Sequence, residues 1–370
     1  MMERKILFTP GPVMISPAVK ESLLHPETAH RRPAFEALFR SVSNRLLAVS
    51  GADNNYAVAL VTGSGSAANE CALSSLVRPT EEVVVVANGP FGDRFKEILA
   101  CHGIRHHVVG DRWGVYPDVR AVERALREHP AARWLAVVWH ETGSGMRNPV
   151  PALCEVAHRL GRRTFVDCVS ALGAEDIHLV RDHVDVATSV GNKALGAITG
   201  VSYVICRRDA VPPLGPDMPR RTMYLSLQNH LRWADEHAQT PNTPAVTAMV
   251  ALDTALAELL AEGVANRVRR VAALARTVRD GVRALGWGLL LPEEQSVHAL
   301  TSVLLPQTMK AEAFIDALDA RGFVLYPGKG VFQDRNVVQV AVMGHLSQED
   351  CRALLKAMRE VARELERAAA

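Results

Sequence analysis

The sequence predicts an α/β fold, with a mostly parallel seven-stranded sheet sandwiched by helices and a smaller C-terminal α+β domain. Short β-branched runs alternate with helix-like stretches through the first 206 of the 370 residues, which is the pattern of successive strand–helix–strand units. Four valines in a row, residues 83–86, fit a strand that is buried on both faces. After about Pro244 the pattern changes to long helical runs with a few strands between them.

The expected elements follow in order along the chain. The seven strands of the sheet are expected at residues 58–62, 83–87, 105–109, 135–139, 164–167, 185–189 and 201–206. Helical patterns lie between them at 66–76, 92–102, 118–128 and 151–160. The second domain is expected to contain helices at 246–261, 265–285, 309–320 and from 348 onward, with strands at 297–305, 324–326 and 337–342. We therefore expect an N-terminal arm (1–15), a large domain (16–245) and a small C-terminal domain (246–370).

Composition and charge exclude several classes of function. An apolar content of 48% and a charged content of 22% are ordinary for a globular protein. The net charge of +2 gives no reason to expect nucleic acid or a membrane as a partner. No apolar run approaches the ~18–20 residues that span a bilayer, and the N-terminal residues lack the apolar core of a signal peptide. The six cysteines are scattered without a C-x-x-C pair, so we expect no metal site, no disulfides and a cytoplasmic location.

Lys193 is the most informative residue of the chain. It is one of only seven lysines, and it directly follows a buried-looking strand, among small residues that leave room for a ligand. Desolvation lowers the pKa of such an amine and suits it to forming a Schiff base. Asp167 ends another short strand 26 residues earlier. Pyridoxal phosphate (PLP) requires a lysine for its aldehyde and an acid for its ring nitrogen. A turn-capping aspartate and a surface lysine explain each residue alone, but explain the pair poorly.

Three further loops follow predicted strands, where ligands bind in parallel α/β sheets. Residues 63–66, Gly-Ser-Gly-Ser, precede a helix, and backbone N–H groups at such a helix start favour a phosphate. Phe91 lies between a strand and a helix, where its ring could stack on a planar cofactor. Residues 140–149 form a polar loop that contains glycine. Each loop alone is a weak signal.

Taken together and in order, these segments resemble a known family. They are residues 8–12, 63–66, 88–92, 140–146, 166–167 and 192–193, and they look like class V aminotransferases of PLP fold type I. The members that the chain resembles most are 2-aminoethylphosphonate–pyruvate and alanine/serine–glyoxylate transaminases, and residues 322–329 favour the first of these. The resemblance extends from Thr9 to about Gly344.

The resemblance implies specific roles for the residues in these segments. Lys193 would form the internal aldimine with PLP and carry the catalytic proton, and Asp167 would pair with the pyridinium nitrogen. Ser64, Gly65 and Ser66 would hold the phosphate, Phe91 would stack on the ring, and Thr142 would reach the phenolic oxygen. Thr243 matches a threonine that contacts the phosphate of the neighbouring subunit. The resemblance thus implies a homodimer with shared active sites that acts on a small amine or amino acid.

One position departs from the family pattern. Members carry an arginine in a late strand, where it grips the substrate carboxylate through two charge-assisted hydrogen bonds, whereas this chain has Gln339. Arg147 is a candidate to compensate, and Arg31, Arg32, Arg94 and Arg335 are others whose default role is a solvated surface one. The alternative is a PLP enzyme that is not a transaminase, namely a lyase, a decarboxylase or an oxygen-using oxidase or monooxygenase. A non-catalytic binding protein is disfavoured because both Lys193 and Asp167 are present.

Overall fold

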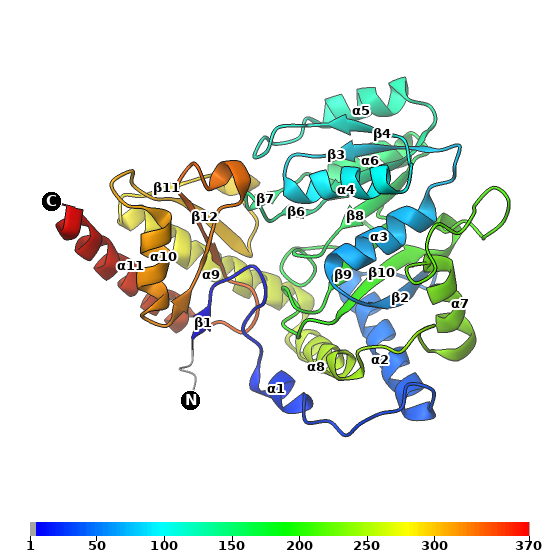
Figure 1. The fold of residues 1–370 in the computed structure, drawn as a ribbon, viewed down its shortest axis with the longest axis horizontal. Coiled ribbons are helices and arrows are strands. Elements are labelled where there is room, and N and C mark those ends of the chain that lie inside the picture. The colour runs from blue at the N-terminus through cyan, green and yellow to red at the C-terminus, as the bar shows by residue number, and fades with distance from the viewer. Residues whose placement is uncertain (1–4, 370) are drawn as a thin grey trace.

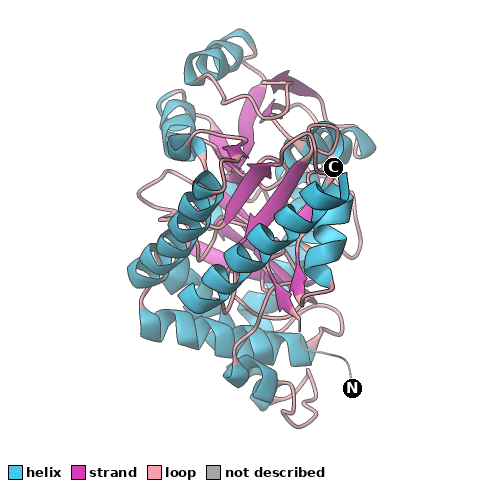
Figure 2. Ribbon diagram, turned by 90° about the vertical axis from the view of Figure 1, so that its left-hand side faces the viewer, coloured by secondary structure: helices cyan, strands magenta, loops and turns pink. Residues whose placement is uncertain are grey.

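The computed structural model describes residues 5–369 (Figures 1 and 2), so residues 1–4 of the expected arm and residue 370 lie outside the described part. The helices are α1 Pro17–Ser22, α2 Pro33–Ser50, α3 Gly65–Leu76, α4 Pro90–Cys101, α5 Val119–Glu128, α6 Val150–Arg159, α7 Leu227–His237, α8 Val246–Glu262, α9 Val264–Ala284, α10 Ala311–Asp319 and α11 Gln348–Ala369. The strands are β1 Ile6–Leu7, β2 Tyr56–Thr62, β3 Glu82–Val86, β4 His106–Val109, β5 Ala132–Val138, β6 His140–Glu141, β7 Met146–Arg147, β8 Arg163–Asp167, β9 Val186–Val190, β10 Val201–Arg207, β11 Gly288–Leu289, β12 Leu300–Leu304, β13 Phe323–Val324, β14 Tyr326–Pro327 and β15 Val337–Ala341.

The central sheet has seven strands in the order β2-β10-β9-β8-β5-β3-β4. The pairs β9–β8, β8–β5, β5–β3 and β3–β4 are parallel. Strand β10 runs antiparallel to both of its neighbours, β2 and β9. The predicted α/β class and the mostly parallel seven-stranded sheet are therefore confirmed.

Two helical layers cover the two faces of this sheet (Figure 2). Val84 and Val86 pack into a cluster with apolar residues of α2, α5, α6 and α8. Val83 and Val85 point to the other face and pack with α3, α4 and α7. Because successive side chains of a strand face opposite ways, the valine run of β3 supplies both layers of the core.

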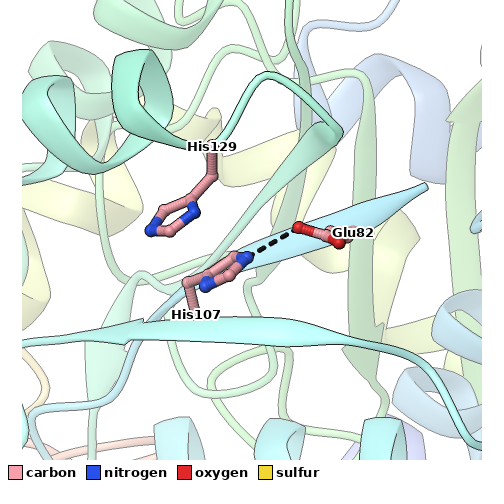
Figure 3. A group of neighbouring side chains, drawn as sticks. All are labelled: Glu82, His107 and His129. Atoms are coloured by element: carbon pink, nitrogen blue, oxygen red, sulfur yellow. Dashed lines mark hydrogen bonds and ion pairs between the residues drawn. The ribbon is translucent and has the colours of Figure 1, made fainter.

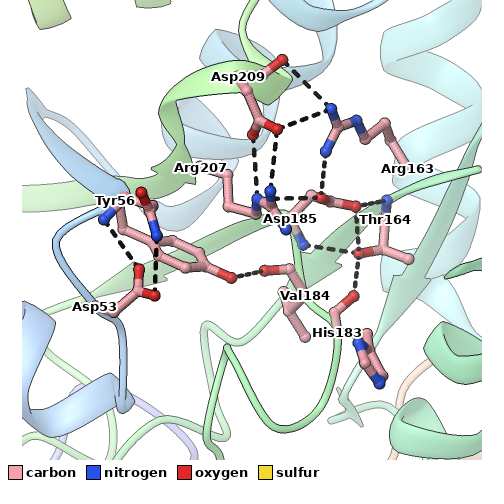
Figure 4. Close-up of polar contacts among 10 residues, drawn as sticks. Asp53, Tyr56, Arg163, Thr164, His183, Val184, Asp185, Arg207 and Asp209 are labelled. Atoms are coloured by element: carbon pink, nitrogen blue, oxygen red, sulfur yellow. Dashed lines mark hydrogen bonds and ion pairs between the residues drawn. The ribbon is translucent and has the colours of Figure 1, made fainter.

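A polar network ties the strands together at the edge of the sheet where β8 and β9 begin (Figure 4). Asp185 precedes β9, and its carboxylate accepts hydrogen bonds from the Thr164 backbone N–H at 2.9 Å and from Arg163 at 2.9 Å. The Tyr56 hydroxyl, at the start of β2, donates to the Val184 carbonyl at 2.8 Å. These contacts fix the amino ends of three strands. The opposite, carboxyl ends of β8 and β9 lead to Asp167 and Lys193.

A second, antiparallel sheet has the order β11-β12-β15-β14. Apolar residues of α9, α10 and α11 pack on it and form a separate cluster (Figure 1). The predicted strand at 324–326 is divided, because β13 pairs with β1 whereas β14 pairs with β15. Helix α8 packs with the central sheet rather than with this second cluster. The division into an arm and two domains stays a prediction.

Three helices of the structure were not expected from the sequence: α1, α2 and α7. Helix α2 buries Phe35, Phe39, Val42 and Leu46, at helical spacing, against the central sheet. It also begins with Pro33 and ends at Gly51, whose φ of 63° is left-handed, so both of its ends carry ordinary helix signals. None of the helices described in residues 5–369 combines the length and apolar character needed to cross a membrane.

Candidate active site

Lys193 lies three residues beyond β9, partly buried beneath the N-terminal arm. Its Nζ donates a hydrogen bond to the Pro10 carbonyl. A Cβ on Gly11 would lie 2.6 Å from that Nζ, and the φ of Gly11, +131°, is one that other residues rarely adopt. Burial and, less strongly, the positive charge of Lys329 lower the pKa of Lys193 to about 8, whereas the charge of Asp167 opposes the shift. The arm thus leaves room for a lysine whose amine is readily freed.

The Asp167 carboxylate ends the neighbouring strand, β8, and is 4% exposed. One oxygen accepts a hydrogen bond from Asn69 Nδ2 at 2.7 Å, and the other accepts from the Val169 backbone N–H at 2.7 Å. The Thr188 hydroxyl on β9 donates in turn to Asn69 Oδ1 at 2.5 Å. Burial raises the pKa of Asp167, and these two donors oppose that rise. The carboxylate is therefore held in one orientation beside the strand that leads to Lys193.

The amino end of helix α3, residues 64–66, is the anion cradle expected from the sequence, and phosphate binding there stays a prediction. Ser64 is the N-cap residue, and Gly65 and Ser66 form the first turn of this 12-residue helix. An Arg94 nitrogen donates to the Ser66 hydroxyl at 2.9 Å. A Cβ on Gly65 would lie 2.7 Å from a Val169 methyl group, so this position has room only for glycine. The start of α3 therefore combines backbone N–H groups, the positive end of the helix dipole and the nearby Arg94 guanidinium. All three favour the binding of a phosphate.

Phe91 stands in the first turn of α4, half-buried. Glu141 fixes this turn, because its carboxylate accepts hydrogen bonds from the backbone N–H groups of Phe91 at 3.3 Å and Gly92 at 3.2 Å. Burial raises the pKa of Glu141 to about 8. A Cβ on Gly89 would lie 2.2 Å from the Glu141 side chain, so the glycine permits this contact. Glu141 thus fixes the backbone that carries the Phe91 ring, and the stacking expected of this ring stays a prediction.

Thr142 lies in the turn between β6 and β7, where its hydroxyl donates to the Ser170 hydroxyl at 3.0 Å. The buried Gln339 on β15 holds this turn by two hydrogen bonds. Its Nε2 donates to the carbonyls of Thr142 at 2.7 Å and Gly143 at 3.0 Å. Gln339 therefore has a structural partner, and the substrate contact expected of it stays a prediction.

His140 is fully enclosed in the same region. Its Nδ1 lies 3.1 Å from the Ser170 carbonyl, and its Nε2 has no hydrogen-bond partner among the described residues. Burial lowers the pKa of His140 to about 4. The ring is therefore neutral at pH 7, with Nδ1–H as the donor and Nε2 as an unsatisfied acceptor.

The structure does not bring every expected residue into this cluster. Arg147 donates to the Glu294 carbonyl at 3.1 Å and lies 3.6 Å from the buried Glu175 carboxylate. With Glu175 and His298 it lines a cavity of about 400 Å³. Thr243 is exposed before α8, and its side chain takes part in none of the hydrogen bonds of residues 5–369. The substrate role of Arg147 and the partner-subunit role of Thr243 stay predictions.

Sequence reasoning missed Asn69, Ser170 and Lys329 as members of the cluster. Asn69 is a buried polar residue one turn into α3, and nothing local to it signals that it meets Asp167. Lys329 could have been found, because it is one of only seven lysines and follows a Tyr-Pro-Gly turn. Its Nζ lies 5.4 Å from the centre of the Phe91 ring.

Among the described residues, one group of three neighbouring side chains could each offer a ligand atom to a metal: Glu82, His107 and His129 (Figure 3). His107 Nε2 lies 2.7 Å from Glu82, which also pairs with Arg105 at 3.0 Å. The two imidazole rings are stacked, 3.4 Å apart and 9° from parallel. Their nitrogen lone pairs lie in the ring planes and run side by side, so they do not converge on one ion. The geometry is that of a polar contact between strands.

The residues around Lys193 fit PLP, the cofactor expected from the sequence. An amine with a lowered pKa, a fixed carboxylate, a held aromatic ring and an anion cradle are the four features that this cofactor needs. The glycines at 11 and 65 leave space where a Cβ would collide with neighbouring side chains. The unsatisfied Nε2 of His140 also indicates a polar partner that the protein itself does not supply.

Known proteins resemble the chain over nearly its whole length. The family model for aminotransferase class-V matches residues 20–353. The 2-aminoethylphosphonate–pyruvate transaminase of Salmonella schwarzengrund is 31% identical over 360 residues, which are 96% of each chain. The alanine–glyoxylate aminotransferase structure from Nostoc sp. has a TM-score of 0.91 and 25% identity, over 98% of this chain and 96% of that one.

A third relative is the pyridoxamine–pyruvate aminotransferase of Mesorhizobium loti. Its structure has a TM-score of 0.90 and 25% identity, over 98% of this chain and 93% of that one. Sequence and fold thus agree on one family, whose members depend on PLP and have PLP fold type I. The chain belongs to the class V aminotransferases and is a PLP-dependent transferase.

Proposed function

We propose that the protein is an aminotransferase that moves the amino group of a small amine or amino acid to a keto acid, with PLP bound through Lys193. The amino substrate would be 2-aminoethylphosphonate-like or alanine/serine-like. One observation carries the proposal: a partly buried lysine, its pKa lowered to about 8, follows the strand next to the one that ends at the fixed carboxylate of Asp167.

PLP, when bound, supplies an aldehyde that condenses with amines and a ring that withdraws electrons from the substrate carbon. Lys193 would hold that aldehyde and, once freed, move a proton between the substrate carbon and the cofactor. Asp167, oriented by Asn69, would keep the ring nitrogen protonated. Ser64, Gly65 and Ser66 would hold the phosphate, with Arg94 beside them. Phe91 would stack on the ring, and the Thr142 hydroxyl would reach the ring oxygen.

A homodimer with shared active sites and a cytoplasmic location belong to the same proposal. Thr243 of the partner subunit would then contribute its hydroxyl to the phosphate cradle. The exposure of Thr243 in the single chain, without a hydrogen-bond partner of its own, supports this part.

The experiment is amino transfer with product analysis. Purified protein is incubated with PLP, one amine (2-aminoethylphosphonate, alanine or serine) and one keto acid (pyruvate or glyoxylate), and alanine is paired only with glyoxylate. We expect the amino acid derived from the keto acid to accumulate in equal amount to the consumed amine. Lys193→Ala should abolish this product, whereas Lys310→Ala, a change at an exposed lysine before α10, should leave it unchanged.

A second function is favoured by one observation, the neutral Gln339 at the position of the usual arginine. A lyase, decarboxylase or oxygen-using oxidase or monooxygenase would consume the amine without a keto acid. A product that forms at the same rate without any keto acid would support this alternative and contradict the aminotransferase.

A further inference from the structure

A substrate with an acidic end needs a positive charge to bind it, and Gln339 cannot supply one. Its amide is neutral, and its Nε2 is already engaged by the carbonyls of Thr142 and Gly143. Arg147 is engaged elsewhere, by Glu175 and the Glu294 carbonyl. Among the described residues, a third cationic side chain near Lys193 is therefore the candidate.

Lys329 has the required position. Its Nζ lies 5.4 Å from the centre of the Phe91 ring, and the Arg94 guanidinium lies 5.0 Å from the same centre. Within residues 5–369, no hydrogen bond or ion pair engages the Lys329 ammonium group, whereas Arg94 contacts Ser66 in the phosphate cradle. Lys329 also lies near enough to Lys193 to be the strongest of the charges that lower its pKa.

The loop that carries Lys329 is anchored to the helix that carries Phe91. The indole N–H of Trp113 donates to Asp93, in the first turn of α4, at 2.7 Å. The same indole covers Gly330, where a Cβ would lie 2.6 Å from the ring. Phe332 packs beside it, with ring centres 6.2 Å apart. Trp113 therefore positions Lys329 relative to Phe91 through packing contacts on both sides.

The charges around Lys193 are unbalanced in the protein alone. Lys193, Lys329 and Arg94 carry positive charge, and among the described carboxyl groups Asp167 is the one whose charge opposes the lowering of the Lys193 pKa. The cofactor phosphate would account for the charge at Arg94, which contacts Ser66. Lys329 is exposed and has no acidic partner among residues 5–369, so its ammonium group is available to a second anionic group.

We propose that Lys329 binds the terminal acidic group, a phosphonate or carboxylate, of the amino substrate, and so takes the place of the missing arginine. This inference rests on the proposed function, since it assumes that the substrate amine reacts at the Lys193 position. It assigns the substrate to small amines with an anionic end, and it makes Lys329 the residue that determines specificity.

The test measures binding of two unreactive probes, ethylphosphonate and propionate, to the PLP-loaded protein by calorimetry. We expect wild type to bind at least one probe, and Lys329→Gln to weaken that binding about tenfold or more, because hydrogen bonds to charged groups are the strong ones. Lys329→Arg should stay within about threefold of wild type, and Lys310→Gln should match it. The probe whose affinity falls more in Lys329→Gln identifies whether Lys329 prefers a phosphonate or a carboxylate on the substrate.

Two outcomes would overturn the inference: Lys329→Gln binding both probes within twofold of wild type, or wild type binding neither. PLP content, measured by absorbance, verifies that each variant is loaded. If Lys329→Gln loses PLP while the loaded fraction still binds the probes normally, Lys329 serves the cofactor and the inference is wrong. If no PLP attaches at Lys193 in wild type, the proposed function itself fails, which is a distinct result.

Discussion

The pH at which the apoprotein captures PLP should be set by Lys193. Only the unprotonated amine attacks an aldehyde, and burial lowers the pKa of Lys193 to about 8, against about 10.4 for a solvated lysine. At pH 7 about one molecule in ten then carries a free amine, compared with roughly one in a few thousand at the ordinary pKa. The rate of capture should rise about tenfold per pH unit below 8 and level off above it.

Stopped-flow absorbance after mixing the apoprotein with excess PLP, from about pH 6.5 to 10, measures this profile. Lys329→Gln removes a like charge near Lys193, so its midpoint should move to higher pH, whereas Lys310→Gln should not shift it. The apoprotein should also gain stability as the pH rises from about 8 towards 10.4, because only the unfolded chain still binds this proton there. A wild-type midpoint near 10 would refute the claim that Lys193 is desolvated.

Three further changes test the surroundings of the site. Asp167→Asn should keep PLP but lower turnover about a hundredfold or more, because an amide cannot hold the ring nitrogen protonated; near-normal kinetics would contradict this role. Asn69→Leu removes one of the two donors to Asp167, so the acid limb of the pH–rate profile should move to higher pH, and an unmoved limb would argue against the contact. Gln339→Met leaves the carbonyls of Thr142 and Gly143 without their donor and should cost about 2–3 kcal/mol in urea unfolding, whereas unchanged stability would show that the turn does not depend on it.

Local sequence signals were sufficient for the fold class and for the residues at strand ends. The valine run of β3 and the strands before Asp167 and Lys193 were recognisable because strands buried on both faces are continuously apolar. The order of the strands was not predictable in this way, because β10 inserts between β2 and β9 through crossovers that only tertiary packing decides. Helix α2 did carry the helical spacing and end signals, and it was missed because the strand–helix alternation begins after it.

The partners of the site residues could not be predicted, because they lie far away in the chain. Gln339 is 197 residues from Thr142, whose carbonyl it binds. Asn69 is 98 residues from Asp167. The substitution at position 339 was visible in the sequence, but its structural role depends on how β15 packs beneath the turn between β6 and β7.

The most direct test of the central claim is to identify the lysine that carries PLP. Borohydride reduction of the loaded protein fixes the cofactor to its amine, and peptide mass mapping then locates it among the seven lysines. We predict the added mass on Lys193 alone, and no fixed cofactor in Lys193→Ala. A reduced adduct on Lys329, which also lies beside Phe91, or on any other lysine would contradict the account.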